Sequence, residues 1–144
     1  MFDTGHRGLR VHAVIKLADL RISQGRMEEA TVLLAGLEDY DAAIVPLARL
    51  HLVKDEASLA RAVLEQSLPD TALWRLEHAP RLLLLVEVLL TQGEATRAQQ
   101  IAEAVATLAD MNESALLWAQ AEIAKGQVKR VAGLPDATQN FTDD

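Results

Sequence analysis

The four histidines are the side chains of this sequence best suited to bind a transition metal or to carry a proton near neutral pH. They are His6, His12, His51 and His78. No two of them lie three or four positions apart, so no helix would place two imidazoles next to each other on one face. The chain also has no cysteine, which removes thiolate ligands and thiol nucleophiles. We therefore expect no metal ion and no histidine-based catalytic site.

The serines and carboxylates give no stronger indication of catalysis. No serine stands in the Gly-x-Ser-x-Gly motif that exposes a nucleophile at a sharp turn. Glu28 and Glu29 fall in the first turn of an expected helix, where acidic side chains interact favourably with the helix dipole. No Gly-x-x-x-x-Gly-Lys-Ser/Thr segment is present to hold a nucleotide phosphate. The sequence thus favours a protein that is not an enzyme and carries no cofactor.

The elements that would hold any site are expected to be helices. The 144 residues include 24 Ala and 24 Leu but only 16 Val and Ile together, and alanine and leucine are strong helix formers. Half of the residues are hydrophobic, which is enough for a buried core, and the length is that of one domain. We therefore expect an all-α protein with a single domain over residues 1–144.

Charge and hydropathy indicate where such a protein would work. The net charge is −7, which disfavours a nucleic acid as the main partner. The N-terminal residues lack the apolar region of a signal peptide. The most apolar stretch, 82–90, has nine residues and includes Glu87, whereas a membrane-spanning helix needs about 20. These features predict a soluble cytoplasmic protein without membrane contact.

A short motif recurs along the chain and sets its organisation. Each copy consists of a helix end, a turn residue and a new helix that carries an alanine five positions after the turn. The turn residues are Gly25, Asp55 and Gly93, and the alanines that follow them are Ala30, Ala60 and Ala98. A fourth turn fits best at Gly133, because Pro135 suits the first turn of the next helix; the competing placement is Gly126. The recurrence predicts stacked helix pairs.

Apolar periodicity gives the expected extent of the helices. They cover 9–24, 26–37, 41–54, 56–68, 80–92, 94–108 and 113–131, with an eighth from Pro135 onward. Asp41 is the expected N-cap of the third, and Pro46 either starts its regular part or kinks it. Residues 71–79 are expected to form a loop or a short extra turn. Paired, these helices define repeats over about 9–40, 41–70, 80–110 and 113–144.

The spacing of small residues around the turns resembles the tetratricopeptide repeat (TPR). Its full form here is Ala18, then Gly25 seven residues later, then Ala30 five residues after that. Ala48 and Val86 stand at the first position of the next two copies, and Gly126 at that of the fourth. The resemblance covers about residues 9–144, although most aromatic positions of the family are absent. It implies a right-handed α-solenoid of about four antiparallel helix pairs.

Two segments resemble a narrower family as well. Residues 17–30 (LADLRISQGRMEEA) and 47–52 (LARLHL) are similar to the helical-repeat region of large LuxR-type, MalT-like bacterial transcription regulators. In that family the repeats follow an ATPase module, precede a DNA-binding helix-turn-helix and receive the signal. The resemblance implies a signal-receiving domain that binds a protein, a peptide or a small inducer. It also implies that these 144 residues are an excerpt of a longer protein.

In a solenoid of this family the first helix of each pair lines an inner surface. The resemblance therefore implies a partner-binding groove made of His12, Ile15, Asp19, Ile22, Val45, Arg49, Leu52, Leu83, Glu87, Leu90, Gln120, Ile123, Gln127 and Arg130. Single charges lie at matching heights in it, namely Asp19, Arg49, Glu87 and Arg130. An isolated charge among apolar residues suits recognition of a peptide or a helix. The alternative is that the apolar members belong to the core of a compact bundle.

Four further expectations concern the two tryptophans, self-association and DNA binding. Trp118 is expected in the core, and Trp74 is expected to cover an apolar edge rather than to anchor a partner. The last helix, with Leu134 and Phe141, has no following element in the sequence to cover it, so a homodimer is the alternative function. A helix-turn-helix that contacts DNA through 26–37 or 127–131 is disfavoured, because the motif recurs as in a solenoid and 26–37 carries two acids.

Overall fold

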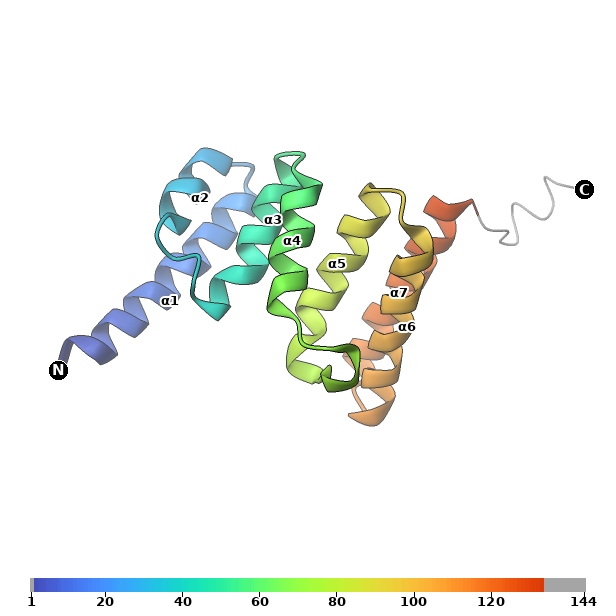
Figure 1. Ribbon diagram of the computed structural model, residues 1–144. Helices are drawn as coiled ribbons and strands as arrows, with labels where there is room; N and C mark the ends of the chain where they lie inside the picture. Colours follow the sequence, from blue (N-terminus) through green and yellow to red (C-terminus); the bar gives the residue numbers. More distant parts are fainter. Residues whose placement is uncertain (1, 134–144) are drawn as a thin grey trace, which may run out of the picture. The chain divides into compact units, whose positions relative to one another are not determined.

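The computed structural model describes residues 2–133 of the protein, with side chains from residue 8 onward. This part of the chain contains helices and no strand, so the expected all-α class is confirmed (Figure 1). The α-helices are α1 (Phe2–Ser23), α2 (Met27–Leu34), α3 (Ile44–Val53), α4 (Ala57–Ser67), α5 (Ala79–Thr91), α6 (Ala95–Met111) and α7 (Ala115–Ala132). Short 3-10 helices lie at η1 (Asp41–Ala43), η2 (Thr71–Leu73) and η3 (Leu76–His78).

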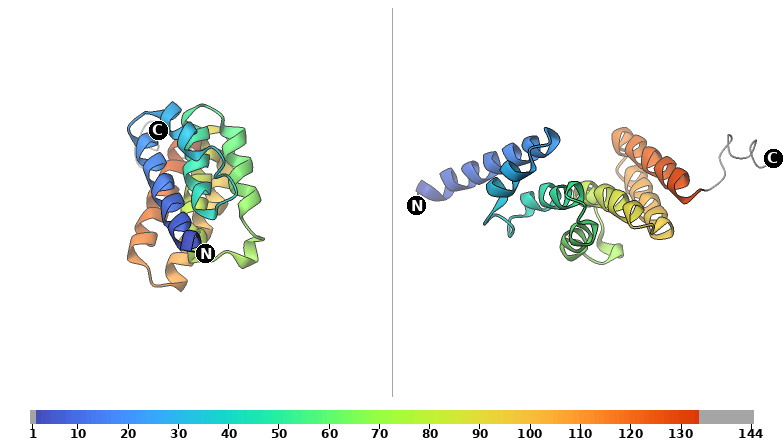
Figure 2. Two further views of the ribbon diagram at one scale, coloured as in Figure 1. Left: turned by 90° about the vertical axis from the view of Figure 1, so that its left-hand side faces the viewer. Right: turned by 90° about the horizontal axis from the view of Figure 1, so that it is seen from above.

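The helices group into two compact units, Met1–Ser67 and Leu68–Asp144. In the first unit α1 packs against α2 and α3, and α3 packs against α4. In the second unit α5 packs against α6 and α7, and α6 lies antiparallel beside α7, as the views of Figures 1 and 2 agree. In each unit the first helices of successive pairs therefore contact each other, α1 with α3 and α5 with α7. The single domain expected over residues 1–144 stays a prediction.

The predicted turns have one common backbone geometry. Gly25, Asp55, Gly93 and Gly133 have positive φ values of 78°, 64°, 78° and 68°. After each of the first three, the next backbone N–H donates 2.8 Å to the carbonyl five residues earlier, from Arg26 to Arg21 in the first copy. This bond and the left-handed residue form the Schellman motif that ends a helix. The motif therefore determines where α1, α3 and α5 stop.

The small residues of the motif lie where the repeat spacing predicted. The side chains seven positions before the first three turns and five positions after them are all fully buried. They are Ala18, Ala48, Val86, Ala30, Ala60 and Ala98. A small buried side chain lets two helix backbones approach closely, so these positions are packing contacts, as expected. In the first unit Ala18 and Ala30 share a core cluster with Ile15, Ile22 and Leu34.

Helix α7 decides between the two placements of the fourth turn. It runs without interruption through Gly126 and ends at Gly133, which has left-handed backbone. The preferred placement at Gly133 is therefore confirmed, and Gly126 is an interior helical residue. A Cβ at Gly126 would meet no heavy atom within 4 Å in the described structure. The helix expected from Pro135 onward, with Leu134 and Phe141, lies outside the described residues.

Several boundaries differ from the expected ones, each for a local reason. Helix α1 begins at Phe2 rather than at residue 9, and α2 ends at Leu34 because Ala35 leaves helical geometry and Gly36 has a φ of 81°. Asp41 does not cap α3: it begins the 3-10 helix η1, and the N-cap of α3 is Ala43, without a side-chain cap. Pro46 lies in the first turn of α3, where no intrahelical N–H bond is lost.

Candidate functional site

The residues expected to line a groove all lie on the first helices α1, α3, α5 and α7, but they differ in exposure. Ile15 and Ile22 are only 3% and 5% exposed and belong to the core cluster of the first unit. Their inclusion in a groove is wrong, because a side chain packed in the core is unavailable to a ligand. The other expected residues on α1 and α3 remain at least partly exposed: His12, Asp19, Val45, Arg49 and Leu52.

Two of the charges expected to be isolated are in fact paired. A guanidinium nitrogen of Arg49, on α3, lies 2.7 Å from a carboxylate oxygen of Asp19, on α1. Each follows directly after the buried alanine of its helix, Ala18 or Ala48, so the contact between α1 and α3 brings the two side chains to the same height. Both remain about 40% exposed, so the pair contributes little to stability. Its importance is that it fixes the position of the Arg49 guanidinium.

Beside this ion pair the surface of the first unit is hollowed. The space has a volume of about 440 Å³ and is lined by Lys16, Asp19, Leu20, Ser23 and Arg49; we call it the inner hollow. The Ser23 hydroxyl donates to the carbonyl of Leu20 at 2.7 Å, and the Leu20 side chain is 49% exposed. The ammonium group of Lys16 has no partner among the described residues. Within the described part of the chain, the inner hollow thus combines a cation without a partner, one paired guanidinium and one exposed apolar side chain.

Sequence reasoning found only part of the inner hollow. It named Asp19 and Arg49 and missed Lys16, Leu20 and Ser23. A signal was present, because residues 16, 19, 20 and 23 have the i, i+3, i+4, i+7 spacing of one helix face.

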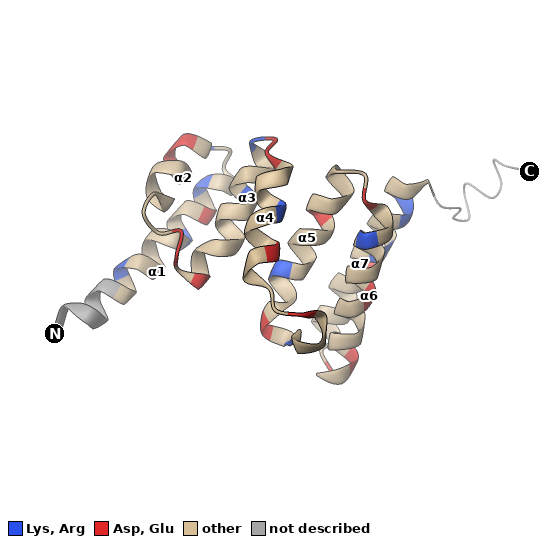
Figure 3. Cartoon of the chain, in the orientation of Figure 1, with Lys and Arg blue, Asp and Glu red and all other residues tan. Residues whose placement is uncertain are grey.

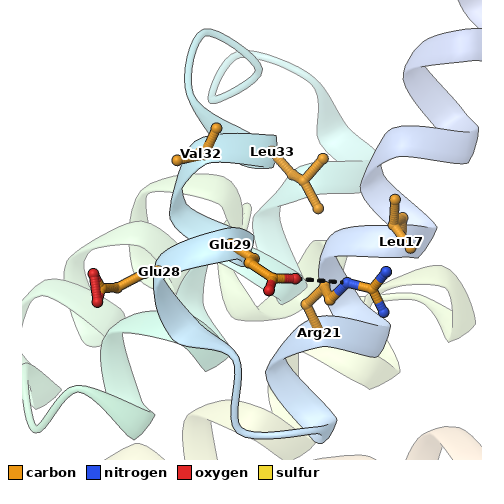
Figure 4. A pocket seen from close by; sticks show the side chains of 6 residues that line it. All are labelled: Leu17, Arg21, Glu28, Glu29, Val32 and Leu33. Carbon is orange, nitrogen blue, oxygen red and sulfur yellow. Dashed lines mark ion pairs between the residues drawn. The ribbon is translucent and has the colours of Figure 1, made fainter.

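A second hollow of the first unit lies between α1 and α2. It also has a volume of about 440 Å³; we call it the outer hollow, and its lining is Leu17, Arg21, Glu28, Glu29, Val32 and Leu33 (Figure 4). Val32 is 74% exposed and Leu17 is 37% exposed. This site was not predicted from the sequence.

The acidic rim of the outer hollow has one free member. The Arg21 guanidinium lies 3.0 Å from the Glu29 carboxylate (Figure 4). This ion pair joins α1 to α2 across the hollow. Arg26 lies 3.7 Å from the same carboxylate. Glu28 makes no ion pair within the described part of the chain. As far as the described residues show, the outer hollow therefore has an apolar interior and a negative charge at its edge that no ion pair neutralises.

In the second unit the expected groove residues lie on α5 and α7, which contact each other. Leu83, Leu90 and Gln127 are half-buried, whereas Glu87, Gln120, Ile123 and Arg130 are exposed. Leu83 and Leu90 flank the fully buried Val86, so they border the core. Basic and acidic residues are interspersed along the described helices in the ribbon of Figure 3.

The histidines with described side chains are dispersed. His51 pairs with Glu56 at 2.9 Å, and the Nδ1 atom of His78 accepts the backbone N–H of Arg75 at 2.9 Å. His12 is exposed on α1. Within the described residues no three His, Asp or Glu side chains converge as a metal site would require.

The sequence predicted the environment of one tryptophan, Trp74, but not that of the other, Trp118. Trp74 is half-buried, and its indole N–H donates to the carbonyl of Pro69 at 2.9 Å, which agrees with the edge-covering role. The expectation that Trp118 is in the core is wrong, since it is 51% exposed. The buried side of α7 consists of Leu117, Ala121, Ala124 and Val128. Trp118 follows Leu117 directly, and one step along a helix turns the side chain by about 100°.

Comparison with known proteins identifies no relative. No family model, no curated protein and no solved structure matches the chain. The likeness to TPR arrays and to the repeat region of LuxR-type regulators therefore stays a prediction. Among the described helices none is long and apolar enough to span a bilayer.

Proposed function

We propose that this chain is a non-catalytic, TPR-like helical-repeat domain that binds a protein or peptide segment along the surface of its first helices. The proposed architecture is a right-handed α-solenoid. Its resemblance to LuxR-type regulators supports a signal-receiving role in a cytoplasmic bacterial transcription regulator. The repeated Schellman turns, the buried alanines in register and the contacts between successive first helices in each unit all support this architecture.

The inner hollow is the observation that carries the proposal. It lies where two first helices, α1 and α3, meet, and it contains Asp19 and Arg49 from the expected groove. The Arg49 guanidinium is held in place by Asp19 and retains further N–H donors for a ligand. Lys16 adds a cation that no described side chain neutralises. A fixed guanidinium beside a free ammonium group attracts a carboxylate.

The neighbouring apolar surface narrows the proposed ligand to a peptide. The exposed half of Leu20 would cover an apolar side chain of the ligand, while Lys16 and Arg49 would bind an acidic group close to it. A segment that combines a carboxylate with a leucine-like side chain fits both features. Such mixed surfaces, apolar with a few placed charges, are typical of peptide-binding sites.

A peptide selection tests this function directly. A displayed library of random twelve-residue peptides is panned against the purified chain, and the enriched peptides are measured by fluorescence anisotropy. We expect acidic peptides with a large aliphatic residue, and we expect Lys16→Glu to weaken their binding about tenfold or more, since an attractive charge becomes repulsive.

Arg10→Glu is the matched control. It makes the same charge change at an exposed position of the same helix, six residues before Lys16 and outside the lining of the inner hollow. The affinity should stay close to that of the unmodified chain. Equal losses in Lys16→Glu and Arg10→Glu would show a nonspecific effect of net charge. The absence of any enriched peptide would refute a peptide-binding role.

A further inference from the structure

Helix α7 carries an apolar stripe that no described residue covers. Leu116, Ile123 and Val131 are 73%, 62% and 56% exposed. At about 100° per residue these three side chains share one face of the helix, together with Gln120 and Gln127. This face is distinct from the buried face of α7 that packs in the second unit. We call it the α7 stripe.

One charged residue flanks the α7 stripe, and it is basic. Arg130 lies in the last turn of α7, is exposed, and makes no ion pair among the described residues. It lies at nearly the same helical angle as Ile123, about two turns further along the helix. The acidic residue of α7, Glu122, pairs with Lys125 at 3.1 Å and lies off the stripe. The α7 stripe is therefore an apolar surface with an unpaired positive charge.

The outer hollow of the first unit has the complementary character. Its lining combines exposed Leu17 and Val32 with Glu28, whose carboxylate is unpaired within the described residues. In Figure 4 the Leu17 and Leu33 side chains border the space above the Arg21–Glu29 ion pair. An amphipathic helix with one apolar row and one flanking cation would fit this site. Its apolar row would be buried in the hollow, and its cation would neutralise Glu28.

The repeat register shows that the outer hollow leaves open a position that is covered elsewhere in the chain. Leu17 lies eight residues before its turn, and Leu47 and Leu85 hold the same position in α3 and α5. Leu47 packs against the core of the first unit, and Leu85 is only 1% exposed. Leu17 is 37% exposed at the equivalent position. Chain packing thus covers this register position in α3 and α5, whereas in α1 it is left open.

We propose that the outer hollow of one copy receives the α7 stripe of a second copy. Ile123 would enter the outer hollow between Leu17, Val32 and Leu33. Leu116 and Val131 would lie roughly 10–12 Å to either side of it along the helix axis, and Arg130 would reach Glu28 at the rim. The proposal goes beyond peptide binding at the inner hollow and uses none of its lining residues. It does use Ile123 and Arg130 of the expected groove, so a second copy bound there would exclude a ligand from α7. Because the two surfaces differ, a single contact leaves one surface free on each copy, and either the same partner or a further copy can occupy it. Copies would therefore associate into a closed pair, a ring or a longer assembly as the concentration rises.

The direct experiment is light scattering of the full chain after size-exclusion chromatography, over a concentration series from micromolar to millimolar. We expect the mean mass to rise above that of the monomer as the concentration increases. Two blocked variants then separate the surfaces. Val32→Asp removes the outer hollow as a docking site, and Ile123→Asp removes the α7 stripe; both positions are mostly exposed, so the fold should tolerate the changes. Each variant alone should remain monomeric.

Mixing the two blocked variants is the decisive step. Val32→Asp retains an intact α7 stripe and Ile123→Asp an intact outer hollow, so the mixture should form one-to-one dimers and nothing larger. Charge reversal gives a second check: Glu28→Arg and Arg130→Glu should each weaken self-association about tenfold or more, and mixing them should restore association, because each outer hollow then meets an α7 stripe of opposite charge on the other variant. A single chain that carries both reversals should recover most of the association, since every contact is then complementary again.

Three results would overturn the proposal. A monomer at all concentrations would mean that the α7 stripe is covered within one chain or serves another partner. A closed dimer that survives both single blocks would indicate a symmetric interface elsewhere. Blocked variants that fail to pair on mixing would show that the two surfaces do not meet. Circular dichroism of each variant verifies that lost association does not reflect unfolding. All these outcomes leave the Lys16→Glu test of peptide binding unaffected.

Discussion

One substitution, glycine to alanine, is expected to have opposite effects at two positions of the second unit. Gly93 has a φ of 78° in the turn after α5, whereas Gly126 lies inside α7. An added Cβ would meet no heavy atom within 4 Å at either position. The comparison therefore isolates the backbone conformation, because neither methyl group gains or loses a described contact.

The magnitudes follow from the two conformations. At Gly93 a left-handed residue other than glycine costs roughly 1–2 kcal/mol, and the reduced entropy of the unfolded chain returns about 0.4–1 kcal/mol. Gly93→Ala should thus lower the free energy of unfolding by about 1 kcal/mol. At Gly126 alanine is favoured over glycine in a helix by about 1 kcal/mol, so Gly126→Ala should raise it by that amount. The two variants should differ by about 2 kcal/mol.

Urea unfolding followed by tryptophan fluorescence measures this difference in the right part of the molecule. Both tryptophans of the chain, Trp74 and Trp118, lie in the second unit, as do Gly93 and Gly126. With a typical urea dependence, the midpoints of the two variants should be separated by roughly 1–2 M. Far-UV circular dichroism provides the parallel record for both units.

Two results would refute the reasoning. If Gly93→Ala unfolds like the unmodified chain, the left-handed turn does not persist in solution. If Gly126→Ala is as destabilising as Gly93→Ala, then Gly126 is either outside a regular helix or in contact with residues beyond the described part of the chain. An equal shift of both midpoints in the same direction would have no explanation in the backbone geometry of these two sites.

Two further substitutions test local features that end or begin helices. Asp55→Gly should stabilise the first unit by about 0.5–1 kcal/mol, because Asp55 holds the left-handed turn at a φ of 64° where the equivalent turns have glycine. Circular dichroism in urea should then show a higher unfolding midpoint than that of the unmodified chain. A lower unfolding midpoint would contradict this prediction. Ser114→Ala should destabilise the second unit by about 1 kcal/mol, since the Ser114 hydroxyl accepts the N–H of Leu117 at 3.1 Å as the N-cap of α7. Tryptophan fluorescence would detect this loss, and Ser114→Thr should largely restore the midpoint.

The helices and their turns were predictable because their causes are local. Alanine and leucine favour helix wherever they stand, and a residue that tolerates left-handed backbone ends a helix through bonds within six residues. The break between α6 and α7 was predicted, but Glu113, with a φ of 50°, was placed as the first residue of a helix because glutamate gives no left-handed signal. The two helix-ending bonds, from Glu113 and Ser114, are present. The sequence preference for Gly133 over Gly126 rested on Pro135, which is also a local signal. Helix α7 confirms it by running through Gly126 and ending before Gly133.

The candidate site was predictable only in part. The spacing of 30 residues placed Asp19 and Arg49 at equal heights, yet it did not reveal that they form an ion pair. The same reasoning assigned Ile15 and Ile22 to a groove although they lie in the core, and it assigned Trp118 to the core although it is exposed. In each case the helix was right and the covered side of the helix was wrong.

The sequence by itself determined that this chain forms short helices joined by left-handed turns, with small residues at the contacts, because backbone propensity and turn geometry act over a few residues. Only the tertiary structure decided which face of each helix is covered, since that depends on the direction in which a neighbouring helix crosses, and one position along a helix shifts a side chain by about 100°. The inner hollow, the outer hollow and the α7 stripe are all consequences of that choice.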